Sequence, residues 1–136
     1  MDIELKTTGW QQAIDITEQV QAVVSQLFEK EKRIICNKKS RACFIYCPHT
    51  TAGVTINEGF DKSVMKDVLE CIDELTPRLD FEHREGNSPA HVKASLVGSS
   101  TLVPIEQGKL DLGQWQKIFF LEFDGPKERK IKITLL

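Results

Sequence analysis

The spacing of apolar side chains predicts three helices. From residue 17 to about residue 31, apolar residues recur every three or four positions and form one stripe, which is typical of a helix packed on one face. The same period runs from Phe60 to Leu75, where the opposite face is charged, and Pro77 ends that segment. A third helix is expected from Ser88 to Val97, since a Ser-Pro pair suits its start and Gly98 suits its end.

Uniformly apolar or alternating segments predict six or seven strands. Residues 42–47 are apolar at every position, as in a strand buried on both faces, and follow a polar turn over residues 37–41. Residues 49–57 alternate, so an extended segment there would present a polar face headed by His49. Further strands are expected over residues 3–7, 14–16, 101–105, 116–123 and 130–135. The Asp-Gly-Pro turn between the last two of these strands predicts a hairpin.

The order of these elements favours the α+β class. Strands gather toward both ends of the chain and do not alternate regularly with helices, so repeated βαβ units are not expected. The chain has 136 residues, an ordinary size for one domain, and it shows no internal repeat, low-complexity tract or linker. We therefore expect a single domain over residues 1–136.

Composition and charge narrow the classes of partner. The chain carries 18 basic and 20 acidic residues, interspersed, so it lacks the basic face of a nucleic-acid-binding protein. No apolar run approaches about 20 residues and the N-terminus lacks a signal-peptide pattern, so neither a membrane span nor secretion is expected. None of the four cysteines forms a C-x-x-C pair, and Cys43 and Cys47 are too far apart along a strand to bridge. We interpret them as reduced side chains in a cytoplasmic protein.

Three histidines in polar segments are candidates for chemistry. His49 follows Pro48 at a strand end, His83 precedes a loop, and His91 lies in the first turn of an expected helix. Because the N-terminus of a helix disfavours positive charge, a neutral His91 would suit a metal ligand or a general base. Their spacing matches no known metal signature such as H-E-x-x-H, so a structural role remains an alternative for each one.

Several other side chains have both a structural and a functional interpretation. Glu122 lies in an apolar strand, where a carboxylate needs either a cationic partner or a functional site. Asp61 either complements a helix start or contributes a carboxylate to a site. Glu58 and Glu85 are further candidate acids, and Trp115 either packs or stacks on a flat ligand.

Four sequence blocks together resemble the YjbQ-like family, whose members are loosely described as secondary thiamine-phosphate synthases. They are P-H-T-T-A-G-V-T-I-N-E at residues 48–58, H-R-E-G-N-S-P-A-H at residues 83–91, S-x-x-V-x-I-x-x-G-x-x-x-x-G-x-W-Q-x-I at residues 100–118, and E-F-D-G-P at residues 122–126. The blocks span about the last two thirds of the chain, in order. One departure is Gln114, where the family usually has threonine.

The resemblance implies a compact domain with a mixed, mainly antiparallel sheet packed against about three helices. It also implies a homotrimer with sites near subunit boundaries. The resemblance further implies one pocket, lined by His49, Asn57, Glu58, Asp61, His83, Asn87, His91 and Glu122. The candidate catalytic residues are His49, Glu58, His83, His91 and Glu122. The candidate substrate-binding residues are Thr51, Asn57, Asp61, Arg84, Asn87, Ser88 and Trp115. The candidate metal ligands are His49, His83 and His91.

The resemblance implies an enzyme that joins a pyrimidine diphosphate to a thiazole phosphate, as a main or a side activity. Such chemistry needs charge neutralisation on the leaving diphosphate, for which Arg84, Lys93 and Arg129 are candidates beside Mg²⁺. One alternative is a metal-dependent hydrolase with a three-histidine site, and another is a small-ligand-binding protein without turnover. The expected partner is a small-molecule substrate, a class that includes phosphorylated compounds. The expected cofactor is a divalent metal, Zn²⁺ or Mg²⁺, and no organic cofactor is expected.

Overall fold

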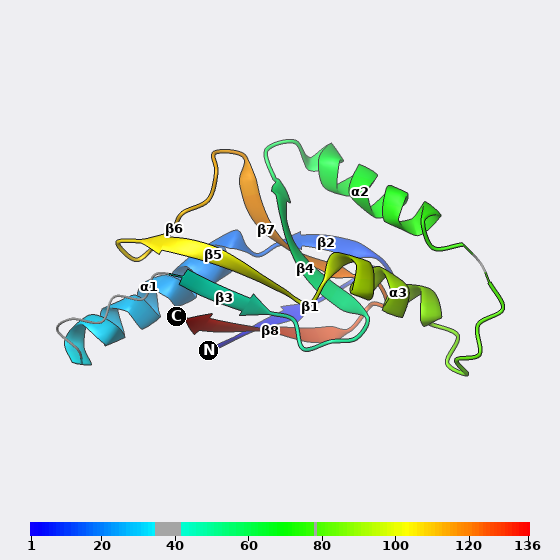
Figure 1. Ribbon diagram of the computed structural model, residues 1–136, viewed down its shortest axis with the longest axis horizontal. Helices are drawn as coiled ribbons and strands as arrows, with labels where there is room; N and C mark the ends of the chain where they lie inside the picture. Colours follow the sequence, from blue (N-terminus) through cyan, green and yellow to red (C-terminus); the bar gives the residue numbers. More distant parts are fainter. Residues whose placement is uncertain (35–41, 78) are drawn as a thin grey trace.

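A computed structural model describes residues 1–34, 42–77 and 79–136 of the chain (Figure 1). The helices in this part are α1 (Thr17–Ile34), α2 (Lys62–Glu74) and α3 (Ser88–Val97). The strands are β1 (Asp2–Lys6), β2 (Gln12–Asp15), β3 (Ala42–Tyr46), β4 (Ala52–Glu58), β5 (Ser100–Glu106), β6 (Lys109–Leu110), β7 (Gln116–Glu122) and β8 (Glu128–Leu135). Cys36 and the turn expected over residues 37–41 lie outside the described residues.

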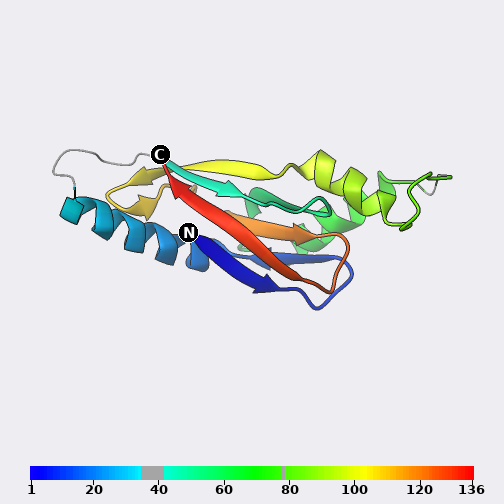
Figure 2. The same ribbon diagram turned by 90° about the horizontal axis from the view of Figure 1, so that it is seen from below.

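The strands form two antiparallel sheets. One has the order β1-β8-β3-β5-β6, and the other has the order β2-β7-β4. In Figure 2 the first strand lies beside the last, so the two ends of the chain belong to one sheet. The expected α+β domain with three helices and mainly antiparallel sheets is confirmed, and the two-residue strand β6 is an addition to it.

The hairpin expected between β7 and β8 is wrong. β7 lies between β2 and β4, which pair with both of its edges. β8 likewise lies between β1 and β3. Because neither strand has a free edge for the other, the turn at residues 124–127 carries the chain from one sheet to the other. A local turn signal could not show this, because it does not specify which strands occupy the edges.

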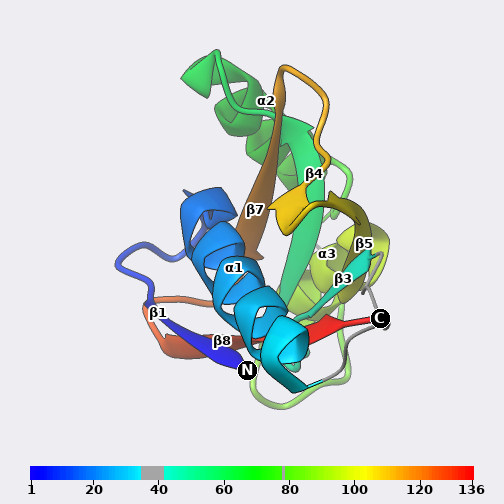
Figure 3. The ribbon, with the colours of Figure 1, turned by 90° about the vertical axis from the view of Figure 1, so that its left-hand side faces the viewer.

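The double burial of β7 explains its nearly continuous apolar sequence. Ile118 and Phe120 belong to the main core, which also contains inward-facing residues of the five-stranded sheet and of α1. Phe119 and Leu121 face the other way and pack against α2 and α3 together with Phe123. Figure 3 shows α1 running across the end of the molecule, against both sheets. The layer order is therefore the five-stranded sheet, then the three-stranded sheet, then α2 and α3, with α1 packed against both sheets at one end.

Some boundaries differ from the expected ones. Residues 47–51 connect β3 to β4, with a turn at residues 50–51, and the strand begins only at Ala52, so the polar face headed by His49 does not continue into β4. Asn87, rather than Ser88, occupies the N-cap position of α3. Phe60 and Leu75 flank α2 and are exposed, because α2 buries its middle turns rather than its ends.

Lys93 ties α3 to its neighbours. Its side chain is fully buried, and its ammonium group donates to Gln11 Oε1 at 2.8 Å and to the carboxylate of Asp73 in α2. The same ammonium lies 4.7 Å from the ring centroid of Trp10. A buried charge needs this complete set of partners. Lys93 therefore fixes α3 in place and is not available as the phosphate ligand that the sequence suggested.

None of the helices in the described part of the chain is both long enough and apolar enough to cross a membrane.

Candidate functional site

A buried ion pair joins the two sheets where β7 ends and β8 begins. The side chain of Glu122 is fully buried, and that of Arg129 is nearly so. Arg129 Nε donates to Glu122 Oε2 at 2.7 Å, and Arg129 Nη2 donates to Glu122 Oε1 at 2.6 Å. Arg129 Nη2 also donates to Thr51 Oγ1 at 2.8 Å. Glu122 thus has the cationic partner that its position in an apolar strand requires, and the two-point contact fixes both side chains.

The carboxylate of Glu122 accepts further hydrogen bonds. The hydroxyl of Thr7 donates to Oε2 at 3.1 Å, and the backbone N–H groups of Phe123 and Asp124 donate to Oε1 at 3.0 and 2.9 Å. Burial by itself would raise the pKa of Glu122, but these hydrogen bonds and the charge of Arg129 outweigh it, so the pKa lies below its ordinary value. Glu122 is therefore a carboxylate, with its hydrogen-bonding capacity largely used inside the protein.

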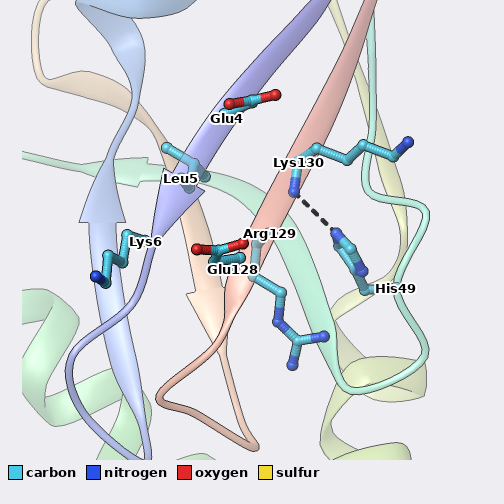
Figure 4. Close-up of a pocket in the computed structure, with 7 residues that line it drawn as sticks. All are labelled: Glu4, Leu5, Lys6, His49, Glu128, Arg129 and Lys130. Carbon is cyan, nitrogen blue, oxygen red and sulfur yellow. Dashed lines mark hydrogen bonds between the residues drawn. The ribbon is translucent and has the colours of Figure 1, made fainter.

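His49 lies next to this pair. Its Nε2 accepts a hydrogen bond from the backbone N–H of Lys130 at 2.9 Å (Figure 4). Burial lowers the pKa of the His49 imidazole, and the positive charge of Arg129 lowers it further. His49 is therefore a neutral side chain at neutral pH.

One hollow beside His49 has a volume of about 450 Å³ and lies against β1 and β8. It is lined by the residues shown in Figure 4: Glu4, Leu5, Lys6, His49, Glu128, Arg129 and Lys130. Glu4 lies opposite Lys130 in the register of β1 and β8, and Lys6 lies opposite Glu128. Such cross-strand pairs of opposite charge stabilise a sheet. The surface charges here balance one another, so this hollow has no excess charge to select a ligand.

A second hollow, which we call the histidine groove, has a volume of about 620 Å³. His49 contributes from the loop before β4, and His91 contributes from α3. The lining residues are Tyr46, Cys47, Pro48, His49, Thr50, Ala52, His91, Ala94, Ser95, Gly98 and Ser99. This lining contains imidazoles and hydroxyls but no carboxylate, ammonium or guanidinium group.

The third histidine is next to the groove. The rings of His83 and His91 meet edge to face, with centroids 5.3 Å apart and an interplanar angle of 80°. Nε2 of His83 lies 4.0 Å from a carboxylate oxygen of Glu85. The structure therefore brings the three histidines into one region. Among the described residues, however, no group of three or more His, Cys, Asp or Glu side chains is placed to hold a metal ion.

Asn87 connects α3 to the turn between the sheets. Its Nδ2 donates to Asp124 Oδ2 at 3.0 Å, and Asp124 also forms an ion pair with Lys127. Asn87 Oδ1 is buried and has no hydrogen-bond partner within the described part of the protein. Of the remaining residues from this block, Arg84 is exposed in the preceding loop, and Ser88 is half-buried at the first position of α3.

The other predicted site residues lie at the far end of the β4–β7 ladder. Ala52 pairs with Glu122 at one end, and Glu58 pairs with Gln116 at the other. At a rise of about 3.4 Å per residue, the two ends are ~20 Å apart. Asn57 and Glu58 are therefore too far from Glu122 to share a pocket within one chain.

Local contacts account for part of this far end. Asp61 Oδ1 accepts hydrogen bonds from the backbone N–H and the hydroxyl of Ser63 at 2.9 and 2.8 Å, so it caps α2. Trp115 meets Phe60 edge to face with ring centroids 5.0 Å apart. Asn57 Oδ1 accepts from the backbone N–H of Glu58 at 2.8 Å. Asp61 thus has the structural role that was one of its two interpretations.

Two contacts of the site were not foreseen. Thr7 reaches Glu122 across 115 positions of sequence, and the backbone of Lys130 reaches His49 across 81. Neither residue type is unusual at its position. The one available signal was the carboxylate in an apolar strand, which implied a partner but did not identify it.

Comparison with known proteins agrees with this fold. The sequence model of the family described as "UPF0047 protein YjbQ-like" matches residues 1–136. The chain belongs to this family. It is 47% identical to the UPF0047 protein YugU of Bacillus subtilis, over 98% of this chain and 96% of that protein. It is 42% identical to a UPF0047 protein of Methanocaldococcus jannaschii, over 98% and 91% of the two chains.

Solved structures of the family have the same fold. The crystal structure of an uncharacterised YjbQ/UPF0047 family protein from Clostridium acetobutylicum superposes with a TM-score of 0.87 at 44% identity, covering 100% of this chain and 99% of that one. A hypothetical protein from Aeropyrum pernix gives a TM-score of 0.86 at 33% identity, covering 100% and 96%. These YjbQ relatives confirm the architecture and name no activity.

The ion pair predicts a specific dependence of stability on pH. Because the pKa of folded Glu122 is lowered, the pair contributes stability that is complete above the ordinary value of 4.5 and is lost as the pH falls through the folded pKa. Arg129→Met leaves a buried carboxylate unpaired, so we expect it to lower the free energy of unfolding at pH 7 by about 3–5 kcal/mol. Denaturant titrations at pH 7 and at a series of pH values falling from 4.5 to about 2 measure both effects.

The control is the double variant Glu122→Leu/Arg129→Met, which removes both charges and is expected to recover much of the loss. In Arg129→Met the acid-induced loss should disappear or reverse, because the unpaired carboxyl group is more easily protonated when buried. A single variant within about 1 kcal/mol of the wild type would contradict this account of the pair.

Proposed function

We propose that this YjbQ-family protein is an enzyme that acts on a small phosphorylated molecule in the histidine groove. The observation that carries the proposal is the convergence of His49 and His91, from separate elements, on one hollow, with His83 against His91. Histidine transfers protons near neutral pH, and hydroxyl groups bind phosphoryl oxygens. The groove offers both kinds of group, and Arg129 of the neighbouring ion pair holds Thr51, two residues after His49, by a hydrogen bond.

The family resemblance suggests the reaction. In thiamine-phosphate synthesis, the thiazole nitrogen forms a bond to the methylene carbon of the pyrimidine diphosphate, the carbon–oxygen bond breaks, and pyrophosphate leaves. The groove has donors for phosphate oxygens but no cationic side chain in its lining. Mg²⁺, if bound with the substrate, would supply the charge neutralisation that this leaving group needs. Because the lining has no cationic side chain, we expect the groove to catalyse this reaction slowly, as a side activity.

We further propose a homotrimer in which the far end of the β4–β7 ladder completes the groove of a neighbouring copy. The predicted site residues at this end are ~20 Å from Glu122 within one chain. Phe60 and Trp115 are 77% and 51% exposed there, which is unusual for two large aromatic rings in contact. Contact between copies would bury these rings and bring Glu58 to the histidines.

We also propose that the protein is cytoplasmic. Cys43 and Cys47 are buried and Cys71 is exposed, and all three are free thiols, as expected in a reducing compartment.

The synthase activity predicts pyrophosphate release that requires both precursors and Mg²⁺. In a coupled pyrophosphate assay at high enzyme concentration, His91→Ala should lower the rate by about 10²–10⁴-fold, as expected for the loss of an acid–base group. Lys66→Ala is the matched control, because Lys66 is exposed on α2, pairs with Glu70 and does not line the groove. No release above background by the wild type would contradict the reaction, and saturable binding without turnover would favour the binding protein instead.

The shared site predicts complementation between inactive variants. We expect His91→Ala and Glu58→Gln to be inactive alone, but mixed trimers formed by co-expression should regain activity in about one third of their sites, since each site draws its two ends from different copies and one of the three neighbouring pairs in a mixed trimer is intact. Sedimentation equilibrium checks the trimer independently. A monomer in solution, or mixed trimers as inactive as their parents, would show that the groove is not completed in this way.

A metal-dependent hydrolase is the second candidate, and one distance favours it. Two imidazoles that bind a tetrahedral metal ion at about 2.0–2.1 Å have ring centroids roughly 5 Å apart. The centroids of His83 and His91 are 5.3 Å apart. A metal-binding pair of imidazoles has this spacing, and so does a pair of rings packed edge to face. Zn²⁺ held there would activate a water molecule for hydrolysis.

This candidate predicts bound metal in the purified protein. Elemental analysis of protein prepared without chelator or nickel should find close to one Zn²⁺ per site in the wild type and in Lys66→Ala. His91→Ala should lose it, because removal of one of two neighbouring ligands leaves no chelating pair. Wild-type protein that contains no metal and takes up no added Zn²⁺ would exclude the hydrolase.

A further inference from the structure

We infer that His49 is a fixed hydrogen-bond donor to an anionic group in the histidine groove, through Nδ1–H, and not a metal ligand. This inference rests on the proposed function only in taking the groove as a ligand site. It assigns a different role to His49 from the one that the sequence suggested, where His49 was grouped with His83 and His91 as a metal ligand.

The hydrogen bond from Lys130 decides the tautomer of His49. A backbone N–H can only donate, so His49 Nε2, at 2.9 Å from the nitrogen of Lys130, must be the unprotonated acceptor. A neutral imidazole then carries its hydrogen on Nδ1. Burial and the nearby charge of Arg129 both favour the neutral ring by lowering the pKa of His49. A metal would need a free lone pair, and in this tautomer the one lone pair is already engaged by Lys130.

The fold explains why this backbone N–H is available. The ladder between β3 and β8 ends where Tyr46 pairs with Lys132. If the ladder continued by two residues toward the start of β8, Pro48 would lie opposite Lys130. The chain has already turned away there. The His49 side chain takes the place of the missing strand. It accepts the hydrogen bond that the backbone N–H of Lys130 cannot donate to β3. Because this contact closes the end of a sheet, the ring has little freedom to rotate.

The orientation leaves Nδ1–H for a ligand. In Figure 4 the ring nitrogen that does not meet Lys130 lies on the side of the ring turned away from β8. His49 lines the histidine groove, where the neighbouring polar groups include the hydroxyls of Thr50 and Ser99. The lining has no carboxylate that would accept this hydrogen, and the nearby carboxylate of Glu122 is already paired with Arg129. A phosphoryl or other oxyanion oxygen is therefore the acceptor that this group is suited to bind.

The tautomer can be measured directly. Long-range ¹H–¹⁵N correlation spectra of the histidine rings, recorded on the wild-type protein at neutral pH, should show a protonated Nδ1 and an unprotonated Nε2 for His49. A protonated Nε2, or a ring that exchanges between both tautomers, would overturn the inference. This readout does not depend on activity, so its failure would leave the proposed enzyme function standing.

Two substitutions test the donor role. His49→Asn keeps an amide N–H close to the position of Nδ1 and loses the acceptor for Lys130. His49→Gln keeps an acceptor for Lys130 and loses the donor at the Nδ1 position. With inorganic phosphate as the probe, we expect His49→Gln to weaken binding by roughly tenfold or more, and His49→Asn to weaken it by less, because hydrogen bonds to charged groups are strong. The amide resonance of Lys130 reports whether the Gln variant preserves the contact.

The results distinguish the donor role of His49 from the proposed synthase reaction. Equal phosphate affinity in the two variants, or no phosphate binding by the wild type, would overturn the donor role of His49. Phosphate binding that depends on His49 as expected, but without pyrophosphate release in the synthase assay, would support the donor role and count against the proposed reaction. Stoichiometric Zn²⁺ that is lost in His49→Gln would also overturn the inference, because it would make His49 a metal ligand.

Discussion

The buried contact between Glu122 and Arg129 is the interaction on which the rest of the structure depends. It joins the last residue of β7 to the second residue of β8, and these strands belong to different sheets. Thr7 brings the end of β1 to the same carboxylate, and Thr51 brings the loop before β4 to the same guanidinium. An ion pair in an apolar interior is stable only when its remaining hydrogen-bonding groups are satisfied, and here Thr7, Thr51 and the backbone of residues 123–124 supply further hydrogen bonds.

Two series of contacts connect this ion pair to the candidate site. Lys130 follows Arg129 in β8, and its backbone N–H fixes the ring of His49. On the other side, Asp124 follows the end of β7 and accepts from Asn87 at the start of α3, the helix that carries His91. Both walls of the histidine groove therefore depend on the same corner of the two sheets. Lys93 supplies a separate anchor for α3, so the position of His91 is held at two points.

The hydrophobic pattern predicted individual helices and strands, but it did not predict which strands pair with each other. The period of α2 and the apolar run of β3 were predicted, because each depends on burial that the local sequence records. The hairpin of β7 and β8 was wrong, because β7 is buried in the middle of its sheet and a turn signal does not exclude other partners. Thr7 was missed because nothing in its neighbourhood points to a carboxylate 115 residues away. The single pocket implied by the family resemblance is divided within one chain, because β4 is long enough to separate Glu58 from Glu122.

The central claim is that the histidines line a site for a phosphorylated ligand. Amide chemical-shift mapping of the wild-type protein during titration with inorganic pyrophosphate tests it most directly. The account predicts saturable shifts concentrated around Thr50, His91 and Ser99, which come from three separate segments of the groove lining. Shifts confined to the hollow between β1 and β8, or no saturable shifts at all, would contradict it.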